Sequence, residues 1–91
     1  MKKVTLNNKE YELVRDDDVF DLSVVSEMVT DYYDDFDYIF GYQAYNKIRL
    51  KGFYDSSNKK AKPINDIKTL DDYIVNYCAY GCKVFLLKKI K

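Results

Sequence analysis

Apolar and polar residues alternate in two short ranges near the start of the chain, 3–6 and 10–15, with Val4 and Leu6 apolar in the first and Tyr11 and Leu13 in the second. Such alternation is typical of strands that have one buried and one solvated face. The residues between them are Asn7, Asn8 and Lys9, and asparagine accepts the positive φ that a tight turn requires. The pattern therefore predicts a β-hairpin.

The spacing of apolar residues then changes from two to three and four, which predicts a helix from about Val19 or Leu22 to about Tyr33. Its expected apolar stripe consists of Leu22, Val25, Val29, Tyr32 and Phe36. The acidic run Asp16–Asp18 precedes this helix. Carboxylates there can cap free N–H groups at the helix start, which we favour, or form a metal-binding loop.

Two further strands are expected at Tyr38–Tyr42 and Ile48–Tyr54, connected by residues 43–47. A polar loop follows over residues 55–65, and the capping-box pattern of Thr69–Asp72 predicts the start of a second helix. The apolar stripe of this helix would be Leu70, Ile74, Tyr77 and Cys78, with Gly81 ending it. Residues 84–87 are apolar on both faces, as in a central strand.

The expected order of elements is therefore β-β-α-β-β-α-β, which predicts an α+β fold with a mostly antiparallel sheet and two helices packed on it. Ninety-one residues make a single domain, residues 1–91. An apolar fraction of 47% and balanced charge exclude an intrinsically disordered chain.

Charge is distributed unevenly along the chain although the net charge is zero. Residues 1–46 contain four Lys/Arg and eleven Asp/Glu, a net charge of −7, whereas residues 47–91 contain eleven and four, a net charge of +7. The asymmetry indicates either a polyanion-binding face or two halves that interleave in one sheet and neutralise each other. The second interpretation is favoured.

The strand expected at 48–54 has two chemically different faces. Ile48, Leu50 and Gly52 share one face, and basic residues share the other with an aromatic residue. Basic and aromatic side chains on an exposed sheet are typical of surfaces that hold phosphates and stack RNA bases. With the lysines of the following loop, the candidate polyanion-binding residues are Lys47, Arg49, Lys51, Phe53, Lys59, Lys60 and Lys62.

Residues 51–54 also begin like the RNP1 motif of RNA-recognition domains, although the match is three residues long. Without the first strand, the element order is that of many ferredoxin-like domains, whose functions are unrelated.

Catalytic and metal-binding patterns are absent from the sequence. The chain contains no histidine, and it has no phosphate-binding loop, dinucleotide fingerprint or nucleophile elbow. Cys78 and Cys82 lack the two further soft ligands that structural zinc needs, so we expect packing roles for both, with a thiol switch as the alternative. We therefore expect no enzymatic activity, no metal and no cofactor.

The sequence has no apolar run long enough to span a membrane, and Lys2 and Lys3 are not followed by the apolar segment of a signal peptide. These features predict a cytoplasmic protein with reduced cysteines.

Four ordered blocks stand out in the sequence, residues 36–41, 48–54, 70–74 and 77–82. Together they resemble the YutD-like family, which comprises small, uncharacterised proteins of low-GC Gram-positive bacteria. The connection at 42–47 departs from the family's glycine- and tryptophan-bearing pattern. The resemblance implies a cytoplasmic α/β domain, and it assigns no activity, cofactor or site residue.

The leading functional hypothesis is therefore a non-enzymatic binding module for RNA or another polyanion. The alternative is a protein–protein adaptor, or a homodimeric interaction module, that uses exposed tyrosines and binds no nucleic acid.

Overall fold

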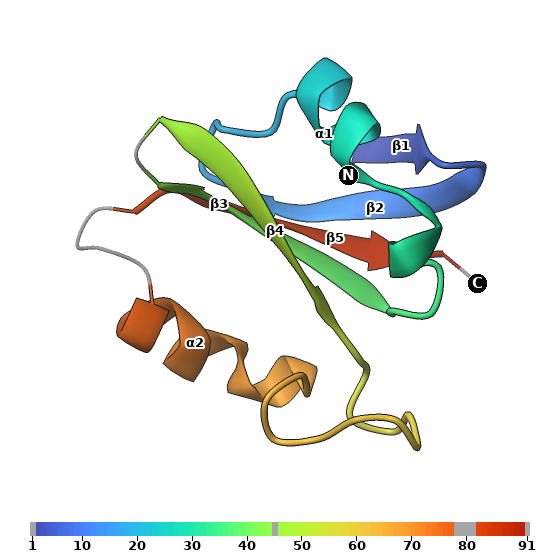
Figure 1. Ribbon diagram of the computed structural model, residues 1–91, viewed down its shortest axis with the longest axis vertical. Helices are drawn as coiled ribbons and strands as arrows, with labels where there is room; N and C mark the ends of the chain where they lie inside the picture. The colour runs from blue at the N-terminus through green and yellow to red at the C-terminus, as the bar shows by residue number, and fades with distance from the viewer. Residues whose placement is uncertain (1, 45, 78–81, 91) are drawn as a thin grey trace.

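The computed structural model contains one five-stranded sheet with helices on both faces (Figure 1). It describes residues 2–44, 46–77 and 82–90. The strands are β1 (Lys2–Leu6), β2 (Lys9–Asp16), β3 (Tyr38–Ala44), β4 (Lys47–Phe53) and β5 (Val84–Lys89). The helices are α1 (Leu22–Met28) and α2 (Leu70–Tyr77), with 3-10 turns η1 (Asp31–Tyr33) and η2 (Ile67–Thr69). The α+β class and the order β-β-α-β-β-α-β are confirmed.

The strand order is β1-β2-β5-β3-β4, and every neighbouring pair is antiparallel. The C-terminal strand β5 is therefore the central strand, as its apolar residues on both faces predict. Its insertion between β2 and β3 separates these two strands, and α1 and α2 pack on opposite faces of the sheet. An RNA-recognition sheet needs a free face for its bases, so this topology does not support the RNP1-like interpretation.

The N-terminal hairpin forms as predicted. Asn7 and Asn8 have φ values of 50° and 64°, and Leu6 pairs with Lys9 across the two-residue turn. Asparagine tolerates this left-handed conformation because its short side chain adds little steric conflict.

The first helix is shorter than predicted. It ends at Met28 because Val29 and Thr30 are extended, and a separate 3-10 turn follows at Asp31–Tyr33. Consecutive β-branched residues favour extended backbone, which explains the break. Tyr32 of the expected stripe is therefore 70% exposed, and Leu22, at the start of α1, is 47% exposed.

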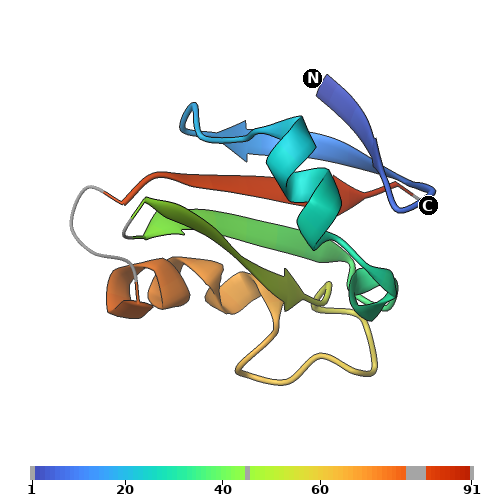
Figure 2. The same ribbon diagram turned by 45° about the horizontal axis from the view of Figure 1, so that its top comes forward.

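Two core clusters lie on the two faces of the sheet. On the α1 face, Val25 and Val29 pack with the hairpin and with Phe85 of β5. On the α2 face, Leu70 packs with Phe40 and Phe53. Figures 1 and 2 show α1 beside β1 and β2, and α2 beside β3 and β4. Among the described residues, neither α1 nor α2 lies over the α1 face of β4.

The second helix begins with η2 rather than with the predicted capping box. The Asp66 carboxylate accepts from the Lys68 N–H at 3.0 Å and from the Ser56 hydroxyl at 2.6 Å, so Asp66 caps the turn that leads into α2. The expected roles of Cys78 and Gly81 lie outside the described residues. No helix in the described part of the chain is long and apolar enough to cross a membrane.

Candidate binding surface

Strand β4 has the two faces that the sequence predicts, but α2 covers part of the basic one. Lys47 and Arg49 are exposed, Lys51 is half-buried, and Phe53 is completely buried. The Phe53 ring packs edge-on against Tyr73 of α2, with 5.8 Å between centroids, and against Phe40 of β3 at 6.2 Å.

The expected role of Phe53 as a platform for nucleic-acid bases is therefore wrong. A base can stack only on an exposed ring, and the Phe53 side chain is fully buried in the core beneath α2. The Lys51 ammonium lies 5.2 Å from the Phe53 centroid and 5.4 Å from the Tyr73 centroid. It forms cation–π contacts at the margin of this core.

The three loop lysines of the candidate set are exposed but make different contacts. Lys60 forms an ion pair with Asp35, and this hydrogen bond raises the pKa of Lys60 and lowers the pKa of the Asp35 carboxyl. The backbone N–H of Lys62 donates to Asn65 at 2.7 Å. Lys59 makes no ion pair among the described residues. The loop is also anchored by Asp37, whose carboxylate accepts from the Asp55 N–H at 2.8 Å.

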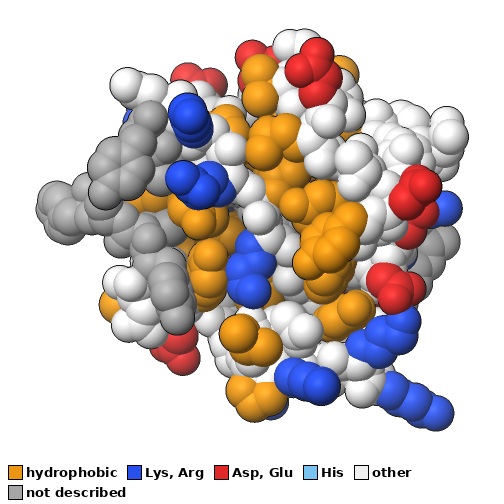
Figure 3. Space-filling view, in the orientation of Figure 1, with side chains coloured by type: hydrophobic (Ala, Val, Ile, Leu, Met, Phe, Trp, Pro, Cys, Tyr) orange, Lys and Arg blue, Asp and Glu red, His pale blue; other side chains and the backbone are white. Residues whose placement is uncertain are grey.

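A groove lies beside β4 on the face that α1 leaves uncovered. It has a volume of about 310 Å³. Its lining residues come from η1 and the turn that follows it, from β4 and from the end of the polar loop: Tyr32, Tyr33, Phe36, Leu50, Lys51, Gly52, Ile64 and Asn65. Figure 3 shows a band of hydrophobic side chains on this face of the molecule, with Lys and Arg side chains beside it.

An aromatic cluster forms one wall of this β4 groove. Tyr32 packs edge-on against Tyr33 with 5.0 Å between ring centroids, and Phe36 packs against Tyr54 at 4.8 Å. The Phe36 ring lies directly over Gly52, where an added Cβ would be 2.3 Å from the ring. Because Gly52 has no side chain, the Phe36 ring can pack directly on the backbone of β4.

Among the groove residues, only Lys51 was a predicted site residue, and the two most exposed residues that sequence reasoning missed are Tyr32 and Ile64. Tyr32 was expected in a buried helical stripe, but it is 70% exposed because the helix ends early. Ile64 is 72% exposed. The sequence feature that could have identified Ile64 as a site residue is a large apolar side chain within an otherwise polar loop.

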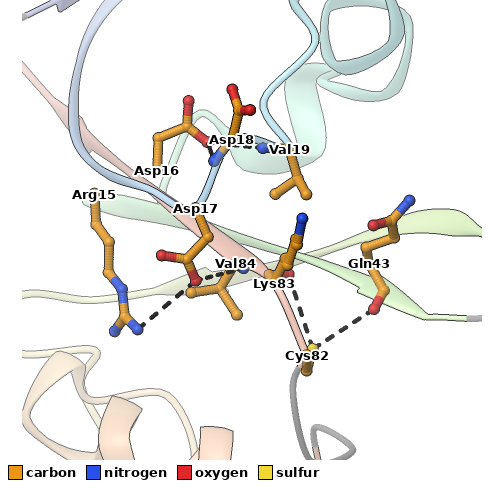
Figure 4. Close-up of polar contacts among 9 residues, drawn as sticks. All are labelled: Arg15, Asp16, Asp17, Asp18, Val19, Gln43, Cys82, Lys83 and Val84. Atoms are coloured by element: carbon orange, nitrogen blue, oxygen red, sulfur yellow. Dashed lines mark hydrogen bonds and ion pairs between the residues drawn. The ribbon is translucent and has the colours of Figure 1, made fainter.

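The acidic run Asp16–Asp18 has a structural role at the end of β2 (Figure 4). One Asp16 oxygen accepts from the N–H groups of Asp18, Val19 and Phe20 at 2.9–3.2 Å. Asp17 accepts from the Val84 N–H at 3.1 Å. The run thus caps the turn before the helix, and Asp21 caps α1 itself. Among the described residues, no group of three or more His, Cys, Asp or Glu could hold a metal ion.

The Cys82 thiol donates to the Gln43 carbonyl at 3.5 Å and is half-buried at the start of β5 (Figure 4). Cys78 lies outside the described residues, so the thiol-switch alternative stays a prediction.

A second hollow, of about 450 Å³, lies where the start of β3 pairs with the end of β5, at Tyr38 and Lys88. It is lined mainly by charged groups, among them Glu12, Asp37, Lys88 and Lys89. Asp37 is 7% exposed, and its carboxylate also accepts from the Asn58 amide at 3.0 Å. These contacts hold the loop, so we assign this hollow a structural role.

A protein-family model described as "Putative antitoxin YutD-like" matches residues 5–88. The chain belongs to the YutD-like family. It is 40% identical to "Putative antitoxin YutD" of Bacillus subtilis (strain 168), over 97% of this chain and 98% of that protein. It is also similar to the solution NMR structure of yutD from B. subtilis, with 39% identity and a TM-score of 0.81, over all of this chain and 84% of that one.

The resemblance of the four sequence blocks is thus confirmed and extends into the N-terminal hairpin. Two of the blocks, 36–41 and 48–54, supply Phe36, Leu50 and Gly52, which are part of the β4 groove.

Proposed function

We propose that this YutD-like chain is a non-enzymatic binding protein whose ligand is a segment of a partner protein. The observation that carries the proposal is the β4 groove, which joins exposed apolar side chains, Tyr32 and Ile64, to the part of the α1 face that α1 leaves uncovered. Clustered aromatic residues with a nearby cation are typical of protein-binding surfaces. The description of the relatives as putative antitoxins concerns those proteins, and it supports a binding role here.

The hypothesis of RNA or another polyanion as ligand has less support from the geometry. Phe53 is buried, Lys60 is paired with Asp35, and each face of the sheet has a helix packed on part of it. The exposed Lys47 and Arg49 could still contact phosphates. We therefore retain polyanion binding as the competing outcome of the experiment, and a cytoplasmic location remains part of the proposal.

Site-specific photo-crosslinking in cells tests the proposal. A photoreactive phenylalanine analogue would replace Tyr32 or Ile64 in the groove, or Val75 as a control. Val75 is 79% exposed on α2 and does not line the groove. We expect nuclease-resistant protein adducts from positions 32 and 64 but not from position 75. Leu50→Glu should reduce their yield because it places a charge on the groove floor.

A different result would identify the competing ligand. Adducts that disappear on nuclease treatment would contradict a protein ligand. They would favour a polyanion if purified protein also bound RNA with a log affinity that falls linearly with log salt concentration. Equal adduct yields from Val75 and the two groove positions would show that the groove is not the binding surface.

A further inference from the structure

Strand β4 is the outer strand on one side of the sheet. It pairs with β3 on its inner edge, and among the described residues no strand pairs with its outer edge. In an antiparallel ladder every second residue directs its N–H and C=O away from a given neighbour. The outer edge of β4 therefore presents backbone groups that an additional strand can use.

The available edge has a defined end. Just beyond β4, Tyr54 forms an isolated parallel bridge with Asp66. The Tyr54 N–H donates to the Asn65 carbonyl at 2.7 Å, and the Ile67 N–H donates to the Tyr54 carbonyl at 2.9 Å. The chain itself thus occupies the edge at Tyr54, and Gly52 and Phe53 are buried, which leaves residues 47–51 of β4 for a ligand.

The two faces beside this edge differ in chemistry. On the α1 face, Ile48 and Leu50 are half-buried at the margin of the core, and Leu50 lines the groove that Tyr32 and Ile64 flank. On the other face are Lys47, Arg49 and Lys51, and none of the three forms an ion pair among the described residues.

We propose that β4 binds an extended segment of a partner protein by strand addition, and that this segment alternates apolar and acidic residues. The inference rests on the proposed function and specifies its ligand. Side chains of an added strand alternate between the two faces. Its apolar residues would enter the β4 groove beside Leu50, and its acidic residues would lie beside Arg49 and Lys51, where opposite charges on neighbouring strands attract.

The same charges argue against a second copy of this chain as the occupant. Pairing of β4 with another β4 would bring Lys47, Arg49 and Lys51 of each copy close to those of the other. Like charges on neighbouring strands destabilise the pair, and lysine on an edge strand is a common means of preventing self-association.

The test uses the whole ¹⁵N-labelled chain and a synthetic, end-capped peptide of sequence Glu-Val-Glu-Leu-Glu-Val-Glu. We expect the amide signals of Ile48 and Leu50 to shift on titration and their hydrogen exchange to slow. A peptide of the same composition with all four glutamates first should bind at least about tenfold more weakly, because it cannot match both faces.

Peptide N-methylation tests the backbone contacts without altering the protein. Two peptides would be methylated on alternate amides, one on the odd and one on the even positions. Only one set of amides can face β4 in an added strand. We therefore expect one methylated peptide to lose binding and the other to keep it.

A matched pair of charge reversals tests the acidic preference. Arg49→Glu should weaken binding of the alternating peptide about tenfold. Lys3→Glu makes the same change of charge at an exposed position of β1, the opposite edge strand, and should leave the affinity unchanged. Equal losses for the two variants would overturn the assignment to β4.

The outcomes distinguish this inference from the proposed function. If the peptide fails to bind, or if both methylated peptides bind, strand addition is overturned, whereas persisting cross-links at Tyr32 and Ile64 would still support a protein-binding groove. Loss of those cross-links as well would overturn both. Concentration-dependent shifts of the β4 amides without peptide would instead identify a second copy of the chain as the occupant.

Discussion

At the scale of single residues, two glycines allow aromatic rings to pack directly on the sheet. A Cβ added at Gly41 would lie 2.1 Å from the Phe85 ring, and one at Gly52 would lie 2.3 Å from the Phe36 ring. Gly41 and Phe85 are paired residues of β3 and β5, and Phe85 is fully buried. The two contacts have different consequences, because Phe85 belongs to the core and Phe36 borders the β4 groove.

Gly41→Ala is expected to destabilise the protein by about 1–3 kcal/mol, because the new methyl group overpacks the core against a ring that has no room to move. The edge-on contact of Phe20 with Phe85, with 5.2 Å between ring centroids, restricts that ring further. Chemical denaturation of the variant measures the loss as a lower midpoint with an unchanged slope.

The control is a double-mutant cycle with Phe85→Leu. The smaller side chain makes room for the methyl group, so the double variant should be less destabilised than the sum of the two single variants. Additive losses would show that the Gly41 backbone, rather than the Phe85 ring, determines the cost.

Phe53 shows that a residue pattern predicts which side chains share a strand face, but not whether that face is exposed. Alternation placed Phe53 on the same strand face as Arg49 and Lys51, and the contact of Lys51 with the Phe53 ring confirms that they share a face. Whether the face is exposed depends on Tyr73, twenty residues later in the sequence, whose ring packs against Phe53. A local pattern contains no information about such a distant contact.

At the scale of elements, Asp66 connects the polar loop to α2. The Ser56 hydroxyl and the Lys68 N–H both donate to its carboxylate, and these hydrogen bonds lower the pKa of Asp66. Asp66 is 7% exposed. One side chain thereby holds both the turn into the helix and the segment that ends the open edge of β4.

This lowered pKa predicts a specific dependence of stability on pH. The pKa is lower in the folded than in the unfolded protein, so ionised Asp66 contributes stability above the unfolded value of about 3.9. The contribution is lost as the pH falls from there through the folded pKa. In thermal unfolding, Asp66→Asn should therefore be less stable than the natural chain at neutral pH, and the difference should narrow in acid.

Glu27→Gln is the matched control, because Glu27 is an exposed carboxylate at the end of α1. It removes one negative charge without removing a cap, so it separates the effect of the lost charge from that of the lost Asp66 hydrogen bonds. A difference for Asp66→Asn that stays constant from neutral to acidic pH would contradict the role of the ionised carboxylate.

The elements were predicted to different degrees. The N-terminal hairpin and β5 were predicted well because alternation, turn residues and apolar content all indicate the same structure. The end of α1 was not, since Tyr32 and Phe36 continue the helical spacing beyond the point where the backbone becomes extended. The groove was missed for the same reason, because it forms where this expected helix ends.

At the scale of the whole molecule, the order of the strands explains the balance of charge. Strand β5 from the basic half of the chain lies between β2 and β3 from the acidic half, and Glu12 stands opposite Lys88. This arrangement supports the interpretation that the two halves interleave. Strand order was beyond sequence reasoning, because the pattern that marks β5 as central does not specify its neighbours.

The central position of β5 leads to a prediction for the whole fold. A fragment of residues 1–82 lacks the strand that joins β2 to β3 and loses the buried side chains of Val84, Phe85 and Leu87. We expect this fragment to show a poorly dispersed NMR spectrum and no cooperative unfolding, because the remaining strands form two separate pairs, which are marginally stable at best.

Adding a synthetic peptide of residues 83–91 should restore dispersion, since β5 supplies both the missing ladder and the missing core. A peptide of the same composition in shuffled order is the control. Native-like dispersion of the fragment alone would contradict the dependence of the fold on β5.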